Sequence, residues 1–224
     1  MNNPQPTPDA NVARAARLDT ATLSDALDKL GIAGQCYRVK PRSPGFRMTG
    51  RAWTLLYGPA GKPAGTVGDY IDDVPPGSVI VLDNGGRENA TVWGDILTEI
   101  AHRRGIAGTV IDGICRDVAL CLDLGYPIYS KDHWMRTGKD RVQVEATGVP
   151  VTVGEARVAP GDILRGDADG VVAIPKEHED TVLDTAEAIE KAEDAIREAV
   201  RGGMRLDEAR QHFRYHQLQT REAS

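Results

Sequence analysis

The sequence predicts a layered α/β fold of the β/β/α type, and two patterns support this prediction. Between residues 50 and 130, apolar strand-like runs alternate with helix-like segments, which is the order typical of α/β domains. Residues 141–175 are rich in Val, Gly and Pro, a composition that indicates short strands, tight turns and a second layer of sheet. A helical C-terminal arm is expected to follow this single domain.

The chain divides into three expected parts. Residues 1–17 are rich in Pro, Asn and other polar residues and lack the basic-then-apolar pattern of a signal peptide, so we expect a loose leader. Residues 18–175 form the predicted domain. Residues 176–224 form the predicted arm, a long Ala/Glu/Arg helix interrupted at Gly202 and Gly203 and followed by a second helix, and we expect it to pack on a neighbouring subunit.

The first element of the domain is a helix over "TLSDALDKLG". Its apolar residues recur at i, i+3, i+4 and i+7, which places them on one face. Thr22 and Asp25 stand at the spacing of a capping box, and Gly31 is suited to end the helix in a left-handed conformation.

The middle of the chain follows a strand-helix rhythm. "GRAWTLLYG" predicts a strand, "AGTVGDYIDDVPPG" a short helix, and "SVIVLD" a buried strand. Residues 91–104 predict a helix with basic residues near its C-terminal end. "GTVID", "DVALCLDLG" and "YPIYS" then predict a strand, a helix and a strand.

Composition restricts the partners and the compartment. The 224 residues are 41% hydrophobic and carry a net charge of −6 with no basic stripe, so we expect no nucleic acid partner. No run of 18 apolar residues occurs, so no membrane span is expected. The three cysteines have no metal-ligand spacing, which favours reduced thiols and a cytoplasmic location.

Charged residues mark both ends of the unit "DILTEIAHRRGIAGTVIDGICRD". Asp95 opens its helix, whereas Arg116 and Asp117 follow a buried strand, and ligands of α/β sheets bind beyond the carboxyl ends of strands. The first amides of the helix lack intrahelical acceptors and can bind an anion; they belong to Gly94, Asp95, Ile96 and Leu97.

A purely structural interpretation of these residues is also open. Asp117 begins a helix and has the residue type of an N-cap, worth about 1 kcal/mol. Asp95 suits the helix dipole in the first turn. Arg116 then serves only as an ion-pair partner of either carboxylate.

An aspartate, twenty intervening residues and then Arg-Asp resemble the motif of the RraA-like family, which includes 4-hydroxy-4-methyl-2-oxoglutarate aldolases. Asp95, Arg116 and Asp117 match the motif in register. Further similarity lies in "SVIVLDNGG", "LSDALDKLGI" and "VAPGDILRGDADGVVAIP", so the resemblance covers residues 18–175. It implies a swivelling-domain-like fold. Trp93 departs from the pattern, because the family often has a smaller side chain there.

The resemblance implies a divalent-metal-dependent pyruvate aldolase. Such an enzyme splits 4-hydroxy-2-oxo dicarboxylic acids, such as 4-hydroxy-4-methyl-2-oxoglutarate, and decarboxylates oxaloacetate. Asp117 is then the ligand of Mg²⁺ or Mn²⁺, Arg116 holds the pyruvyl oxygens, and Asp95 positions a water that protonates the product. The amides of residues 94–97 receive the substrate carboxylate. The resemblance also implies a homotrimer or homohexamer with sites at the subunit interfaces.

Two other functions remain open. Some RraA-like proteins are regulators that bind and inhibit the endoribonuclease RNase E. Those regulators lack the final aspartate of the motif, so the presence of Asp117 favours the enzyme. A related metal-dependent lyase or hydratase acting on another 2-oxo or sugar acid is the second alternative.

Other candidate residues favour structural roles. His212 and His216 have the i,i+4 spacing of a zinc pair, but neither a third ligand nor an intervening Glu accompanies them. Cys115 adjoins Arg116, which would lower the pKa of its thiol, although a buried apolar role is favoured. "GDADG" at residues 166–170 is expected to be a turn between strands.

Overall fold

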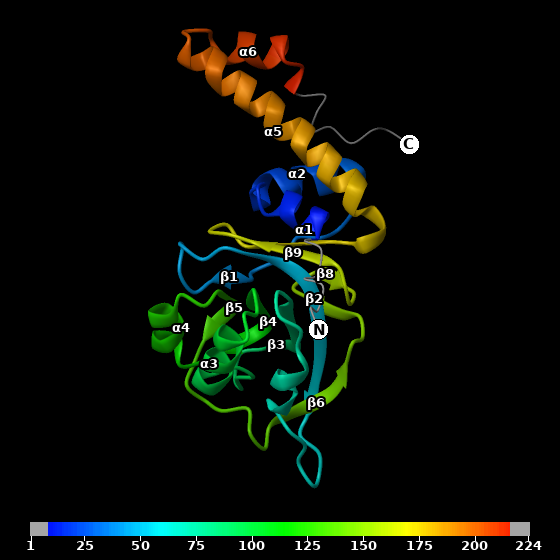
Figure 1. The fold of residues 1–224 in the computed structure, drawn as a ribbon, viewed down its shortest axis with the longest axis vertical. Coiled ribbons are helices and arrows are strands. Elements are labelled where there is room, and N and C mark those ends of the chain that lie inside the picture. Colours follow the sequence, from blue (N-terminus) through cyan, green and yellow to red (C-terminus); the bar gives the residue numbers. More distant parts are fainter. Residues whose placement is uncertain (1–8, 216–224) are drawn as a thin grey trace, which may run out of the picture.

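An eight-stranded mixed sheet forms the centre of the computed structural model, which describes residues 9–215 (Figure 1). Its strands are β1 (Lys40–Pro41), β2 (Met48–Pro59), β3 (Val79–Arg87), β4 (Gly108–Cys115), β5 (Ile128–His133), β6 (Val142–Thr147), β9 (Ile163–Gly166) and β10 (Val171–Ile174). They lie in the order β1-β5-β4-β3-β2-β9-β10, and β6 pairs with β2 beside this path.

The strands β2, β3, β4 and β5 run parallel to one another, and the other pairings in the sheet are antiparallel. α3 (Asp95–Arg103) connects β3 to β4, and α4 (Val118–Leu124) connects β4 to β5. The predicted alternation of strands and helices is therefore confirmed. Because β3 and β4 are parallel, the loops that leave their carboxyl ends meet at one edge of the sheet.

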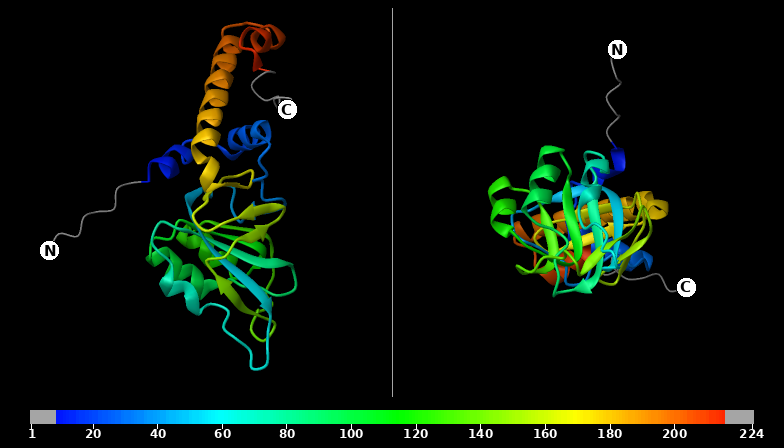
Figure 2. Two further views of the ribbon diagram at one scale, coloured as in Figure 1. Left: turned by 90° about the vertical axis from the view of Figure 1, so that its right-hand side faces the viewer. Right: turned by 90° about the horizontal axis from the view of Figure 1, so that it is seen from below.

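Three layers make up the domain. α3 and α4 pack against each other over one face of the sheet, and the hairpin of β7 (Val151–Val153) and β8 (Ala156–Val158) covers the other (Figures 1 and 2). Two buried carboxylates hold the hairpin: Asp83 accepts the Thr152 N–H at 3.0 Å, and Asp112 accepts the Gly154 N–H at 2.9 Å. The predicted β/β/α layering is confirmed.

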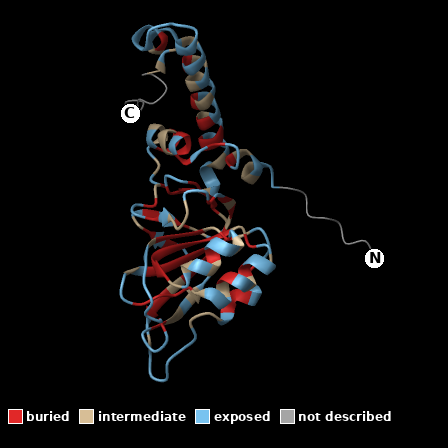
Figure 3. Ribbon diagram, turned by 90° about the vertical axis from the view of Figure 1, so that its left-hand side faces the viewer, coloured by how far each residue is buried: buried red, intermediate tan, exposed pale blue. Residues whose placement is uncertain are grey.

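A second apolar cluster joins the chain ends to the sheet. It combines α1 (Ala10–Ala15), α2 (Thr20–Leu30), β9, β10 and the first half of α5 (Glu179–Arg201). Beyond this cluster α5 runs away from the sheet, and α6 (Leu206–His212) folds back on it (Figures 1 and 3). The arm is therefore anchored in a core at its base and exposed toward its tip.

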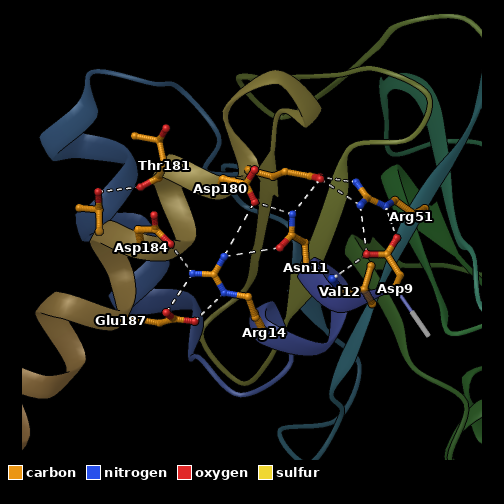
Figure 4. A network of polar contacts seen from close by, with 11 residues as sticks. Asp9, Asn11, Val12, Arg14, Arg51, Asp180, Thr181, Asp184 and Glu187 are labelled. Carbon is orange, nitrogen blue, oxygen red and sulfur yellow. Dashed lines mark hydrogen bonds and ion pairs between the residues drawn. The ribbon is translucent and has the colours of Figure 1, made fainter. Parts of the chain in front are cut away.

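Arginines tie α1 to this arm (Figure 4). Arg51 on β2 contacts both Asp9, at 2.8 Å, and Glu179, the first residue of α5. Arg14 contacts Glu187 on α5 at 2.8 Å. These hydrogen bonds to arginine lower the pKa values of Asp9, Glu179 and Glu187 below their ordinary values.

Several expected boundaries differ in the structure. Residues 10–15, expected in a loose leader, form α1, because Asp9 caps the helix and its buried face packs on α5. The expected capping box of Thr22 and Asp25 was wrong: α2 starts two residues earlier, and Asp19 accepts the Thr22 N–H at 2.7 Å. Gly31 ends α2 at φ 69° as predicted.

Two short segments are also corrected. The helix expected over residues 91–104 begins only at Asp95, since residues 91–94 form a loop in which Thr91 pairs with residues 136–137. The expected helix in "AGTVGDYIDDVPPG" is the short 3-10 helix η1 (Asp69–Asp73), and a second one, η2 (Lys176–His178), precedes α5. Residues 166–170 form the predicted turn, between β9 and β10.

Candidate active site at the β4–α4 junction

The three residues of the Asp…Arg-Asp motif meet where β4 ends. The Asp117 Oδ2 atom lies 3.1 Å from the Arg116 Nε atom and accepts the Asp95 backbone N–H at 3.2 Å. The Asp95 carboxylate accepts the N–H of Ile96 at 2.8 Å. The edge of the parallel sheet thus brings together residues that are more than twenty positions apart, as the sequence predicted.

Asp117 does not cap the helix that it precedes. Its side chain makes no capping hydrogen bond to α4 and turns instead toward the first turn of α3. Its backbone lies in the left-handed region at φ 57°, which is uncommon for a residue other than glycine and costs about 1 kcal/mol. Asp117 therefore occupies the N-cap position of α4 without capping that helix through its side chain.

Gly94 leaves the space in which these side chains meet. A Cβ atom on this residue would lie 2.7 Å from the Asp117 Oδ2 atom and 3.2 Å from the Arg116 Nε atom. The first contact is shorter than real Cβ contacts and the second is tighter than most of them, so a larger residue would displace the carboxylate or the guanidinium. Gly94 also contributes to the N-terminus of α3, where backbone amides favour an anion.

Trp93 anchors the loop, although the sequence did not indicate this. Its ring is 2% exposed, stacks on Tyr126 at a centroid distance of 6.2 Å, and donates from Nε1 to the Thr98 Oγ1 atom at 2.9 Å. The Trp93 carbonyl accepts the Arg116 N–H at 3.0 Å. The larger side chain at this position is buried beneath the loop and holds the backbone of Arg116 in place.

A cavity of about 540 Å³ opens beside the motif. α3 forms one wall with residues 94–97 and Ile100, and residues 67–72, which include part of η1, form the opposite one. Residues 91–93, Arg116, Thr137 and Gly138 complete the lining. Asp117 does not line the cavity. It contacts the Arg116 side chain and the Asp95 backbone N–H, and both of these residues line the cavity.

The donor set fits a hard cation that retains water. Within residues 9–215, no three His, Cys, Asp or Glu side chains converge as a metal-binding group. The Asp117 carboxylate is 37% exposed, which leaves room for water ligands, and Arg116 occupies only one side of it. Mg²⁺ and Mn²⁺ are held by one or two carboxylates with several waters, so Asp117 fits such an ion and does not resemble a zinc site.

A family model described as RraA-like, Aldolase/RraA, matches residues 20–173. The chain belongs to the RraA-like family. The resemblance inferred from the motif is thereby confirmed, and the matched range holds every residue of the candidate site. The helices α1, α5 and α6 lie outside it.

Two curated proteins illustrate the range of RraA-like relatives. Protein DlpA of Legionella pneumophila is 39% identical over 203 residues, which cover 89% of this chain and 33% of that protein. The chain therefore spans about one third of the length of that relative. The Halalkalibacterium halodurans protein named "Putative 4-hydroxy-4-methyl-2-oxoglutarate aldolase" is 33% identical over 81% of this chain and 83% of that protein.

Solved RraA-like structures share the fold. An uncharacterized protein from Pseudomonas syringae has a TM-score of 0.84 and 40% identity, over 92% of this chain and 99% of that chain. Streptomyces coelicolor RraAS2, described as an unusual member of the RNase ES inhibitor RraA protein family, has a TM-score of 0.79 and 29% identity. That match covers 86% of this chain and 100% of that chain.

The remaining candidates have structural roles or lie outside the described residues. Cys115 is fully buried, and burial raises the pKa of its thiol; Arg42, not Arg116, is the cation that opposes this. His212 ends α6, whereas His216 lies beyond the described residues, so the proposed pair cannot be placed. The wall formed by residues 67–72 was not predicted, because no spacing rule connects it to α3.

Proposed function

We propose that this RraA-like chain is a divalent-metal-dependent lyase that cleaves 4-hydroxy-2-oxo acids to pyruvate and decarboxylates oxaloacetate. The observation that supports this most strongly is the orientation of Asp117: a strained, half-exposed carboxylate turned away from its own helix toward Arg116 and the α3 N-terminus. The aldolase name of the Halalkalibacterium halodurans relative agrees with a carbon-carbon lyase. Dicarboxylic acids such as 4-hydroxy-4-methyl-2-oxoglutarate are the substrates that this name suggests.

In this proposal Arg116 and the N-terminus of α3 bind the substrate, and Asp95 serves proton transfer. Arg116 donates to the oxygens of the pyruvyl unit, because its guanidinium lines the cavity beside Asp117. The N-terminus of α3 receives the carboxylate of the same unit through the amides of Gly94 and Leu97, because those of Asp95 and Ile96 already donate to carboxylates. Asp95 lies at the cavity edge, where it holds the water that gives a proton to the C3 carbon of the departing pyruvate.

Asp117 is the proposed metal ligand. When bound there, Mg²⁺ or Mn²⁺ supplies a Lewis acid that draws electron density from the 2-keto group, so that negative charge can develop at C3. The Arg116 contact at 3.1 Å holds the Asp117 carboxylate beside a residue that lines the cavity. Loss of an aldehyde or ketone and loss of CO₂ leave the same charge at C3, which is why one site serves both reactions.

Pyruvate release tests this proposal. Purified protein is incubated with oxaloacetate or 4-hydroxy-4-methyl-2-oxoglutarate, and pyruvate is followed with a coupled dehydrogenase, with added Mg²⁺ and with EDTA. We expect pyruvate from both substrates with Mg²⁺ and none above background with EDTA. Absence of turnover with both substrates at every Mg²⁺ and Mn²⁺ concentration would contradict the proposal.

A regulatory role is the alternative, and the similarity to Streptomyces coelicolor RraAS2 favours it. In that case the chain binds an endoribonuclease and has no lyase activity. The two functions are distinguished by a binding measurement with purified RNase E alongside the pyruvate assay. Tight binding without pyruvate release would select the regulator.

Two further properties belong to the proposal. We propose a homo-oligomer, trimer or hexamer, with the sites at subunit interfaces, because exposed apolar side chains lie next to the candidate site. Ile96 is 71% exposed and Met135 is 72% exposed. Met135 lies near the motif because the N–H of the preceding residue, Trp134, donates to the Cys115 carbonyl. We also propose a cytoplasmic location: Cys36, Cys115 and Cys121 are free and buried, and no described helix is long and apolar enough to cross a bilayer.

A further inference from the structure

The cavity extends well beyond the space that a pyruvyl unit needs. Arg116 and the first residues of α3 occupy one part of the lining. Residues 67–69, 71 and 72 line a second part, and the whole cavity of about 540 Å³ is within the range of small-molecule sites. If the 2-oxo end of a substrate is held by Arg116, its distal end extends into this second part.

Acidic side chains line this second part. Asp69 and Asp72 lie on η1, and among the described residues that line the cavity Arg116 is the one cation. Arg104 lies 3.6 Å from the Asp72 carboxylate and compensates part of its charge, but Arg104 does not line the cavity. No ion pair to Asp69 forms within residues 9–215. Within one chain, the described side chains that line this part of the cavity therefore carry net negative charge.

Apolar groups provide the remaining surface of this second part. Val67 and Ile71 line the cavity on one side, and Leu97 and Ile100 line it from α3. The Leu97 side chain reaches across to Gly68, where a Cβ atom would lie 3.2 Å from the Leu97 Cδ2 atom. A methyl or short alkyl group would find van der Waals contacts here, whereas a carboxylate would lose water without gaining a cation.

We infer, on the basis of the proposed lyase function, that the preferred substrate is a monocarboxylic 4-hydroxy-2-oxo acid whose distal end is uncharged and apolar. Asp69 and Asp72 are then specificity-determining residues that disfavour a second carboxylate by like-charge repulsion. Dicarboxylic acids, which the name of the relative suggests, become the poorer substrates of the same site.

Two matched pairs of probes test this inference on the full-length protein with Mg²⁺. 2-Oxopentanoate and 2-oxoglutarate differ only by a methyl group or a carboxylate at the distal carbon, and titration calorimetry gives their dissociation constants without turnover. 4-Hydroxy-2-oxopentanoate and 4-hydroxy-2-oxoglutarate form the equivalent pair for pyruvate release. We expect the methyl member to be favoured at least about tenfold in both pairs.

Variants locate the origin of the preference. In the double variant Asp69→Asn with Asp72→Asn, we expect the preference to fall at least about threefold, because both like charges are removed. Asp73→Asn is the matched control: Asp73 is an exposed residue of η1 outside the cavity lining, so the preference should not change.

The outcomes separate the two proposals. A dicarboxylate that binds as well as its methyl analogue, or a preference unaffected by the double variant, overturns the inference about the distal end. A preserved binding preference without any pyruvate release overturns the lyase function and leaves the binding inference standing. Failure of both 2-oxo acids to bind overturns both.

Discussion

At the scale of single residues, the left-handed backbone of Asp117 turns its carboxylate toward Arg116 and the N-terminus of α3. The order of strand and helix in the sequence places Asp95 and Arg116 at one edge of the sheet, and the structure confirms this. The left-handed backbone of Asp117 has no sequence signal, since aspartate is also the ordinary N-cap residue. The role of Trp93 was equally hidden, because it depends on stacking with Tyr126, 33 positions away.

Asp117→Asn should remove metal-dependent pyruvate release at least about a hundredfold, because a neutral amide is a poor ligand for a hard cation. Asparagine tolerates the left-handed backbone, and the side chain does not cap α4, so the melting temperature should change by less than about 2 °C. Asp123→Asn, an exposed residue of α4, is the control for both measurements. An active Asp117→Asn protein would contradict the assigned role.

Gly94→Ala should lower kcat/KM about tenfold to a hundredfold, because the added Cβ atom displaces the Asp117 carboxylate or the Arg116 guanidinium. Steady-state kinetics with oxaloacetate and Mg²⁺ measure the effect. Gly45→Ala is the matched control, since the nearest atom to its Cβ is the Ser43 Oγ atom at 3.9 Å. Equal activity of both variants would show that the space at Gly94 is not needed.

At the scale of elements, the strands and most helices followed from their hydrophobic pattern, whereas contacts between distant elements did not. The β3–α3–β4–α4–β5 order is visible in the sequence because each element has its own apolar period. α1 was missed because six residues are too few for a helix that is stable on local propensity alone, and this one is also stabilised by packing on α5 and by the bond between Asp9 and Arg51. The cavity wall around η1 was missed for the same reason.

The ion pairs between α1, β2 and α5 predict acid-sensitive stability. The hydrogen bond from Arg51 lowers the pKa of Glu179 below its ordinary value of 4.5, so the stabilisation is present above that value and is lost as pH falls through the folded-state pKa. Arg51→Met should cost about 1–2 kcal/mol of unfolding free energy near neutral pH. The difference between wild type and variant should shrink from about pH 6 to about pH 3.

Urea unfolding across that pH range measures this difference. Arg201→Met is the control on the same arm, because Arg201 and its partner Glu198 are 74% and 79% exposed and their pair should contribute little at any pH. A pH-independent difference for Arg51→Met would show that Arg51 stabilises the arm by packing alone.

At the scale of the whole molecule, the sequence predicted the layered domain and the arm but not how they are joined. The expected boundary at residue 176 passes through one apolar cluster, since α2 and β10 pack with α5. Residues assigned to the leader, the domain and the arm thus share a core. Assembly could be expected only from the family resemblance, because a single chain shows exposed apolar groups without showing what covers them.

Light scattering after size-exclusion chromatography should give three or six times the chain mass of 24.2 kDa. Met135→Glu should lower that mass, because it places a charge on an exposed apolar side chain beside the site. A monomer at all protein concentrations would contradict the proposed assembly and would leave the candidate site complete within one chain.

The most direct test of the central claim is anomalous diffraction from crystals soaked with Mn²⁺ and pyruvate. The account predicts a manganese peak within coordination distance of the Asp117 carboxylate, with pyruvate between that ion and the Arg116 guanidinium. A structure with no manganese at Asp117, or with pyruvate bound elsewhere, would contradict it.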